Sequence, residues 1–152
     1  MSDKAFITCL WFDTEAEEAA AFYTGIVKDS KLGRVHRHTE AGPGPAGSVM
    51  LVEFELNGQK FFALNGGPEN YGFSEAVSIM VECENQAEVD YYWDRLTEGG
   101  AGVACGWLED KYGFRWRQEE EAPRTDWESW PLVAWTSQTT VRVPAVQSPW
   151  VG

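Results

Sequence analysis

Two stretches decide the fold: LWFDTEAEEAAAFY at Leu10–Tyr23 and VECENQAEVDYYWD at Val81–Asp94. In each, an apolar strand end leads through an acidic turn into a segment whose apolar residues have helical spacing. Few positions are identical, but the shared order of features indicates an internal repeat. We therefore predict an α+β fold built from paired βαβββ modules.

The first predicted module has one helix and four strands. The expected elements are a strand buried on both faces over residues 5–12, a helix over 14–27, and strands over 31–39, 49–56 and 59–65. Thr14 and Glu17 match the S/T-x-x-E capping pattern for the helix start. Asn57-Gly58 predicts a type I′ hairpin turn, because both central positions of that turn require positive φ.

The second predicted module follows the same order. The expected elements are a strand over residues 77–83, a helix over 86–98, strands over 104–109 and 114–118, and a turn at Asp110–Gly113 between these two strands. We place the domain at residues 1–118, with modules at about 5–67 and 76–118. Residues 119–152 hold an acidic run, four tryptophans and four prolines without a helical period. This predicts an irregular tail, with an edge strand at Val141–Val143 as the alternative.

Composition argues against several classes of partner. The 152 residues carry a net charge of −12, whereas nucleic acids and anionic membranes reward clustered Lys and Arg. The three cysteines, Cys9, Cys83 and Cys105, form no CxxC pair, which predicts free thiols in a reducing compartment. The start of the chain lacks the features of a signal peptide, and no apolar run approaches the ~20 residues of a membrane span. We therefore expect a cytoplasmic protein that binds neither nucleic acid nor membrane.

Five segments together resemble a known family over roughly residues 6–116. They are ITCLWFDTEAEEAAAFY, AGPGPAGSVMLVEFELNGQ, FALNGGP, QAEVDYYWDRLTEGG and CGWLEDKYGFRW. This set resembles the PhnB-like family, whose members are labelled 3-demethylubiquinone-9 3-methyltransferase-like or glyoxalase-like. The resemblance implies the vicinal oxygen chelate fold, in which paired modules curl into a curved sheet cup, and it implies a homodimer.

The chain departs from that family after the YG-x-x-W motif. Arg117 stands where the family usually has Gln, and no amphipathic C-terminal helix follows. Two explanations stay open: a frame change in the gene near residues 113–118, and a tail specific to this lineage. The coding DNA distinguishes them, because only a frame change leaves an amphipathic helix in an alternative frame.

The sequence predicts no metal and no cofactor. Metal-dependent members of the superfamily place His and Glu ligands on cup-facing strands. The repeat puts residues near Phe6 or Thr8, and near Val77 or Ser78, on the first strands of the two modules, and Arg117 stands near the position where a Glu would be expected. His36 and His38 share a strand face at i, i+2 spacing but lack a convergent carboxylate, so we predict surface histidines. Methyl transfer is also disfavoured, because no glycine-rich strand-to-helix loop is present to hold S-adenosylmethionine.

Several residues keep two interpretations. Glu53 is either a cup-lining general base or a solvent-facing side chain, and Asn65 either orients a polar ligand or stabilises a turn. Trp107 and Trp116 form either an aromatic wall or part of the core. Cys9 and Cys105 are expected in the core, because no further His is present to activate a thiolate.

The favoured function is the binding of a small molecule in the cup without a metal. The candidate ligand-binding residues are Thr8, Trp11, Glu53, Asn65, Ser78, Trp107, Trp116 and Arg117. The rival is an enzyme, a metal-assisted lyase, isomerase or dioxygenase of the glyoxalase superfamily. A dimeric scaffold for a protein partner is the third possibility, and it draws only on the Trp-rich tail.

Overall fold

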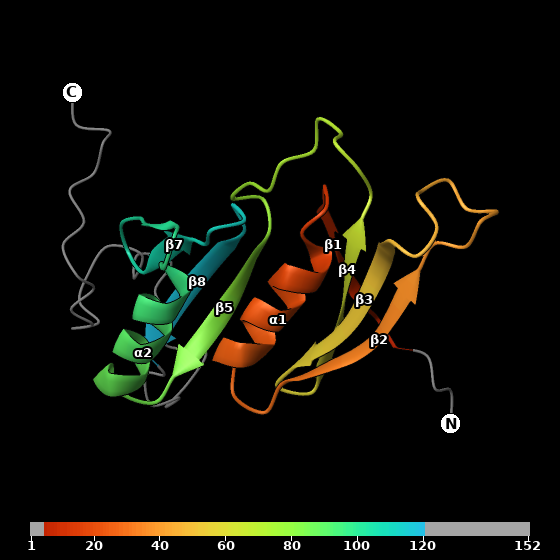
Figure 1. Cartoon of the computed structure of the whole chain (residues 1–152). Coiled ribbons are helices and arrows are strands. Elements are labelled where there is room, and N and C mark those ends of the chain that lie inside the picture. Colours follow the sequence, from red (N-terminus) through yellow and green to blue (C-terminus); the bar gives the residue numbers. More distant parts are fainter. Residues whose placement is uncertain (1–4, 121–152) are drawn as a thin grey trace. The chain divides into compact units, whose positions relative to one another are not determined.

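The computed structural model describes residues 5–120 (Figure 1). The chain divides between Tyr71 and Gly72 into two compact units. Within residues 5–120, each unit holds one helix and one four-stranded sheet. Neither described helix is long and apolar enough to cross a membrane. The predictions for the tail beyond residue 120, including the strand at Val141–Val143, lie outside the described residues.

The first module contains one helix and four strands. Its elements are β1 (Thr8–Phe12), α1 (Ala16–Ile26), β2 (Lys31–Arg37), β3 (Val49–Leu56) and β4 (Gln59–Asn65). The sheet order is β1-β4-β3-β2, with β1 parallel to β4 and the other pairs antiparallel. The predicted hairpin turn between β3 and β4 is confirmed, because Asn57 and Gly58 have φ of 48° and 81°.

The second module repeats this topology. Its elements are β5 (Ser78–Cys83), α2 (Gln86–Leu96), β6 (Ala101–Gly102), β7 (Trp107–Glu109) and β8 (Arg115–Glu120). The sheet order is β5-β8-β7-β6, and β5 pairs parallel with β8 as β1 does with β4. The α+β fold with paired βαβββ modules is therefore confirmed. Of the predicted strand over residues 104–109, only residues 107–109 form a strand (β7); residues 103–106 form a turn, and the short strand β6 precedes it outside the predicted range.

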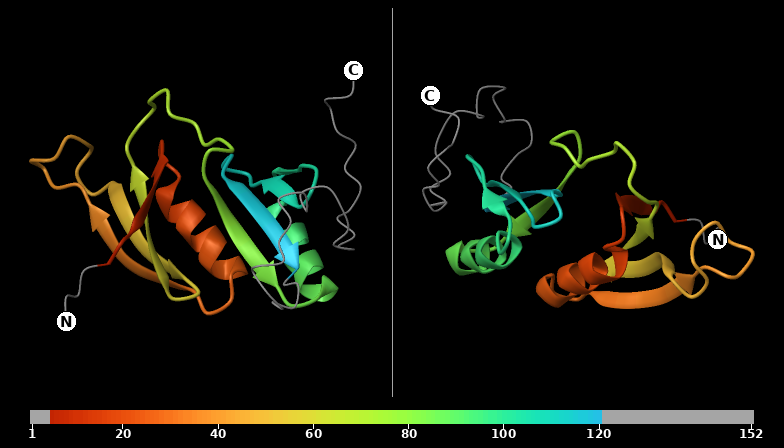
Figure 2. Two further views of the ribbon diagram at one scale, coloured as in Figure 1. Left: turned by 180° about the vertical axis from the view of Figure 1, so that it is seen from behind. Right: turned by 45° about the horizontal axis from the view of Figure 1, so that its top comes forward.

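Each helix packs against one face of its own sheet (Figure 2). In the first module, α1 presents Ala16, Ala19, Ala20, Tyr23 and Ile26 to the sheet, and the alanines let the helix approach closely. Strand β3 alternates as predicted, with its even-numbered residues 52, 54 and 56 buried beneath α1. Each large apolar side chain buried in this way stabilises the fold by roughly 1.5–3 kcal/mol.

The start of the first module corrects two predictions. Strand β1 is an edge strand covered on one face only, so Leu10 is buried whereas Cys9 is exposed. The Thr14–Glu17 capping box does not form. The cap residue of α1 is Glu15, which makes no side-chain cap bond, and its carboxylate instead accepts a hydrogen bond from the backbone N–H of Thr14.

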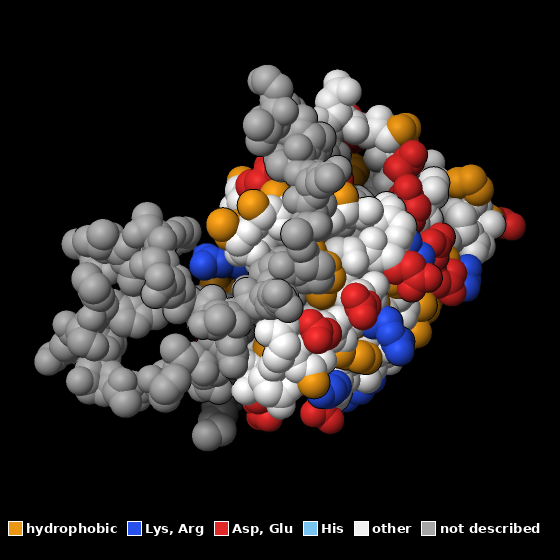
Figure 3. Space-filling model, turned by 90° about the vertical axis from the view of Figure 1, so that its left-hand side faces the viewer, with side chains coloured by type: hydrophobic (Ala, Val, Ile, Leu, Met, Phe, Trp, Pro, Cys, Tyr) orange, Lys and Arg blue, Asp and Glu red, His pale blue; other side chains and the backbone are white. Residues whose placement is uncertain are grey.

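On the described part of the face seen in Figure 3, acidic and basic side chains are interspersed with apolar ones.

Candidate ligand-binding site

The first sheet has one face that α1 does not cover. Side chains alternate along each strand, so the residues out of phase with the core point away from the helix. Strand register places two rows across this surface: Trp11, Leu64, Leu51 and His36 in one, and Cys9, Phe62 and Glu53 in the other. We call these seven residues the open face. All are half-buried except Cys9, which is exposed.

Trp11 is held at one end of the open face by the LNGGP segment. Its indole Nε1 donates a hydrogen bond to the backbone oxygen of Gly67 at 3.2 Å. Its ring lies against Gly66, where a Cβ atom would overlap it, and meets Tyr71 edge-on at 5.5 Å between centroids. The absence of a side chain at Gly66 therefore decides where the Trp11 ring can lie.

Glu53 and His36 form a pair at the other end of the open face. The distance from His36 Nε2 to Glu53 Oε1 is 2.6 Å, and the two side chains are 34% and 40% exposed. Glu53 lies on the face of the sheet opposite α1 with its side chain partly exposed, so both of its interpretations stay predictions. A half-exposed carboxylate beside apolar side chains can accept a hydrogen bond from a polar group of a ligand.

His38 does not join His36 in a metal site. Residue 38 lies beyond the end of β2, and its ring lies against Gly42 and Gly44 of the loop that follows. His36 is instead engaged with Glu53. Among residues 5–120, no group of three or more His, Cys, Asp or Glu is placed to hold a metal ion.

Asn65 is used by the fold. Its Oδ1 accepts a hydrogen bond from the backbone N–H of Ala16 at 2.8 Å, and its Nδ2 donates to the backbone oxygen of Val49 at 3.1 Å. Asn65 thus satisfies one of the free amides at the start of α1 from a strand 49 residues away. Its Oδ1 therefore caps a helix and does not close the local turn that the sequence suggested, and its contact with a ligand stays a prediction.

We predict that Asn65→Ala lowers the free energy of unfolding by ~1–2 kcal/mol, because it removes a helix cap and leaves two backbone groups unsatisfied. Urea denaturation measures this difference. Asn70→Ala removes the same side chain from an exposed loop position and is expected to change stability by less than ~0.5 kcal/mol. Equal effects of the two substitutions would contradict the capping role.

The second sheet separates the two tryptophans of the predicted aromatic wall. Leu108 pairs with Trp116 across β7 and β8, so Trp107 lies on the opposite face, paired with Arg117. Trp116 is fully buried in the core, whereas Trp107 is half-buried with the Arg117 guanidinium 5.8 Å from its ring centroid. The wall prediction is therefore wrong for Trp116.

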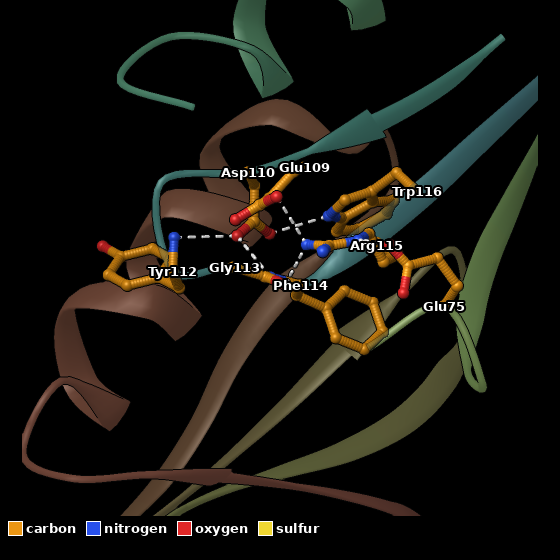
Figure 4. Close-up of polar contacts among 8 residues, drawn as sticks. All are labelled: Glu75, Glu109, Asp110, Tyr112, Gly113, Phe114, Arg115 and Trp116. Atoms are coloured by element: carbon orange, nitrogen blue, oxygen red, sulfur yellow. Dashed lines mark hydrogen bonds and ion pairs between the residues drawn. The ribbon is translucent and has the colours of Figure 1, made fainter. Parts of the chain in front are cut away.

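The carboxylate of Asp110 accepts hydrogen bonds from the connection between β7 and β8 and from Trp116 on β8 (Figure 4). This carboxylate is almost completely buried, and Oδ2 accepts a hydrogen bond from Trp116 Nε1 at 2.8 Å. Its Oδ1 accepts from the backbone N–H groups of Tyr112 and Phe114 at 2.9 and 3.1 Å. Sequence reasoning identified this turn but not the buried carboxylate that closes it.

Arg115 bridges two carboxylates on the uncovered side of the second sheet, as Figure 4 shows. It donates to Glu75 Oε1 through Nε at 3.1 Å and pairs with Glu109 Oε2 at 2.8 Å. The pKa of Glu75 lies below its ordinary value. The largest cause is a hydrogen bond from the backbone amide of Glu75 to its carboxylate, and the next is the Arg115 guanidinium. A lowered folded-state pKa means that this carboxylate stabilises the fold above its unfolded pKa, and that the contribution is lost as pH falls through the folded pKa.

We predict that Arg115→Gln raises the pKa of Glu75 toward the ordinary glutamate value, because it removes two of the causes that lower it. A pH titration followed by NMR of the side-chain carboxyl carbon measures the midpoint. Arg95→Gln removes a guanidinium that lies over the Tyr91 ring and is expected to leave that midpoint unchanged. An unchanged midpoint in Arg115→Gln would contradict the pairing.

The remaining candidates fall in different places. Thr8 is exposed and follows the phase of Leu10 on β1, so it lies on the helix side of the sheet. Ser78 is half-buried and shares the uncovered side of the second sheet with Arg115, its partner on β8. The expectation of core cysteines is wrong for Cys9 and Cys105, which are exposed, although partial burial of its thiol raises the pKa of Cys9.

Comparison with known proteins places the chain in a family. The family model described as 3-demethylubiquinone-9 3-methyltransferase matches residues 4–118. A solved structure, the PhnB protein from Bacillus cereus, is 33% identical, covers 78% of this chain and 100% of its own, and superposes with a TM-score of 0.69. The chain belongs to the PhnB-like family. The family match ends at residue 118, so it does not include residues 119–152.

More distant structures share the fold of this PhnB-like chain. Protein PA1353 from Pseudomonas aeruginosa is 18% identical, covers 78% of this chain and 100% of its own, and has a TM-score of 0.60. The fosfomycin resistance protein FosX from Mesorhizobium loti is 12% identical, covers 81% and 95%, and has a TM-score of 0.54. These likenesses confirm the vicinal oxygen chelate fold of the PhnB-like chain. No curated protein matches it.

Proposed function

We propose that this PhnB-like protein binds a small molecule on the open face of its first sheet, and that binding needs no metal. The observation that carries the proposal is the cluster of Trp11, Leu51, Phe62 and Leu64 on the sheet face that α1 does not cover, directly beside the Glu53–His36 pair. Apolar walls with a few placed polar groups are the usual composition of small-molecule sites.

The second sheet offers further contacts on the side opposite α2. Ser78, Trp107 and Arg117 stay candidates for ligand contact, because strand register keeps all three on the side opposite the buried Trp116. A guanidinium over an indole provides both a charge and a flat surface. Trp116 is withdrawn as a candidate, since it is enclosed in the core and bonded to Asp110.

A thermal-shift screen tests the proposal. The full chain is heated with a panel of aromatic and aliphatic small molecules in EDTA, and then with Zn²⁺, Ni²⁺ or Mn²⁺ alone. We expect at least one panel compound to raise the melting temperature in EDTA, because a ligand at 100 times its Kd stabilises the native state by ~2.7 kcal/mol. Stabilisation by a metal alone, with none from organic compounds, would favour a metal-assisted lyase, isomerase or dioxygenase instead.

We predict that S-adenosylmethionine gives no saturable heat in isothermal titration calorimetry, despite the wording of the family's description. The connection from β1 to α1 holds Asp13, Thr14 and Glu15 and no glycine. The two described sheets also differ from the doubly wound parallel sheet that usually binds this cofactor. Stoichiometric binding would contradict the prediction.

We further propose that the protein acts as a cytoplasmic homodimer. The resemblance to the PhnB-like family supports this proposal. Exposed apolar side chains also support it, among them Ile7 and Val77, which directly precede the edge strands β1 and β5. Light scattering after size-exclusion chromatography is expected to give twice the mass of one chain. A monomer at micromolar concentration would contradict the proposal.

A further inference from the structure

Glu53 has room for a second partner. Its Oε1 is bonded to His36, but a carboxylate has two oxygens and about four acceptor sites. The side chain is 40% exposed, so solvent or a ligand can reach it. Its neighbour across the strands on the open face is Phe62, which places an aromatic ring beside the carboxylate.

Charged side chains lie next to Glu53 on the side toward the hairpin turn. Along β3, the next residue on the same face is Glu55, whose carboxylate lies 3.4 Å from Lys31 Nζ and whose partner on β4 is Lys60. This charged row lies toward the hairpin turn. On the other side of Glu53 the next row holds the apolar Leu51 and Leu64, with His36 at its β2 end.

We infer that the open face selects amphipathic amines, molecules with one ammonium group and a flat apolar body. This rests on the function proposed above and names its ligand class. The ammonium donates to Glu53 in a charge-assisted hydrogen bond, and the ring face of Phe62 adds a cation–π contact. The apolar body lies over Leu64 toward Trp11. The net charge of −12 further favours cations over anions at the protein surface.

Three probes with one ring system test the preference for amines: the amine 1-naphthylmethylamine, the alcohol 1-naphthalenemethanol and the carboxylate 1-naphthaleneacetate. Each is titrated into the full chain and followed by two-dimensional ¹H–¹⁵N NMR. We expect the amine to bind about tenfold more tightly than the alcohol, which corresponds to ~1.4 kcal/mol, and the acetate to bind most weakly. The advantage of the amine should shrink as salt is raised, because ions screen an exposed charge pair.

Two matched variants locate the effect. Glu53→Gln keeps an oxygen that can accept from His36 but removes the charge, so the amine should bind only as tightly as the alcohol. Glu55→Gln removes a charge from the same strand face, where Lys31 already pairs with it, and should keep the preference. Equal affinity for all three probes in the wild-type chain, or an unchanged preference in Glu53→Gln, overturns the inference. If no probe shifts the signals of Phe62 or Leu64, the proposed function itself fails.

Discussion

Asp110→Ala is expected to lower the free energy of unfolding by ~3–5 kcal/mol. The substitution leaves buried hydrogen-bond donors without an acceptor, and each unsatisfied donor costs ~1–3 kcal/mol. The carboxylate accepts from the indole of Trp116 and from the backbone N–H groups of Tyr112 and Phe114. The bonds from Phe114 and Trp116 are buried, and the bond from Tyr112 is partly buried, so solvent has little access to replace them. Urea denaturation of the two proteins measures the difference.

Two further variants separate this effect from the loss of a charge. Asp94→Ala removes an exposed carboxylate from α2 and is expected to change stability by no more than ~0.5 kcal/mol. Combining Asp110→Ala with Trp116→Phe should lower the free energy of unfolding by less than the sum of the single changes, because Trp116→Phe removes the indole N–H that Asp110→Ala leaves unsatisfied. A loss below ~1 kcal/mol in Asp110→Ala would contradict the role of this carboxylate, since one unsatisfied donor alone costs that much.

Gly66→Ala is expected to destabilise the first module by ~1–3 kcal/mol and to weaken binding on the open face. The added Cβ atom would overlap the ring of Trp11, so the indole must leave its place. It would then lose its hydrogen bond to Gly67 and its edge-on contact with Tyr71. Urea denaturation gives the stability change, and the Trp11 indole N–H signal in NMR reports the movement.

A Gly→Ala substitution at an exposed helix position should raise the stability of the protein and not lower it. Gly25 lies on the exposed side of α1 with open space around its Cα atom, so Gly25→Ala is expected to stabilise the protein by ~0.5–1 kcal/mol. An unmoved Trp11 signal in Gly66→Ala, or equal stability changes for the two substitutions, would show that Gly66 is not required by the indole.

The local patterns of the sequence were sufficient for most of the fold. Alternation over residues 49–56 and the Asn57–Gly58 pair locate β3, its turn and β4, because both signals act over a few residues. The open face explains the error at β1. Its exposed side carries Cys9 and Trp11, so the strand is apolar on both sides and its periodicity cannot show which side the helix covers.

Contacts that depend on register or on distant partners were not predictable in this way. A four-residue turn at Asp110–Gly113 would pair Trp107 with Trp116 on one face. The connection between β7 and β8 instead runs over residues 110–114, and the extra residue pairs Leu108 with Trp116. The cap that Asn65 provides for α1 and the bond between His36 and Glu53 join residues far apart in sequence, and no local pattern marks them.

The most direct test of the account is a search for intermolecular nuclear Overhauser effects between 1-naphthalenemethanol and the isotope-labelled full chain. Because this probe carries no charge, it tests the binding surface independently of the preference for amines. We predict cross-peaks from its ring protons to side-chain protons of Trp11, Phe62 and Leu64. Saturable binding whose cross-peaks reach only residues outside the open face would contradict the account.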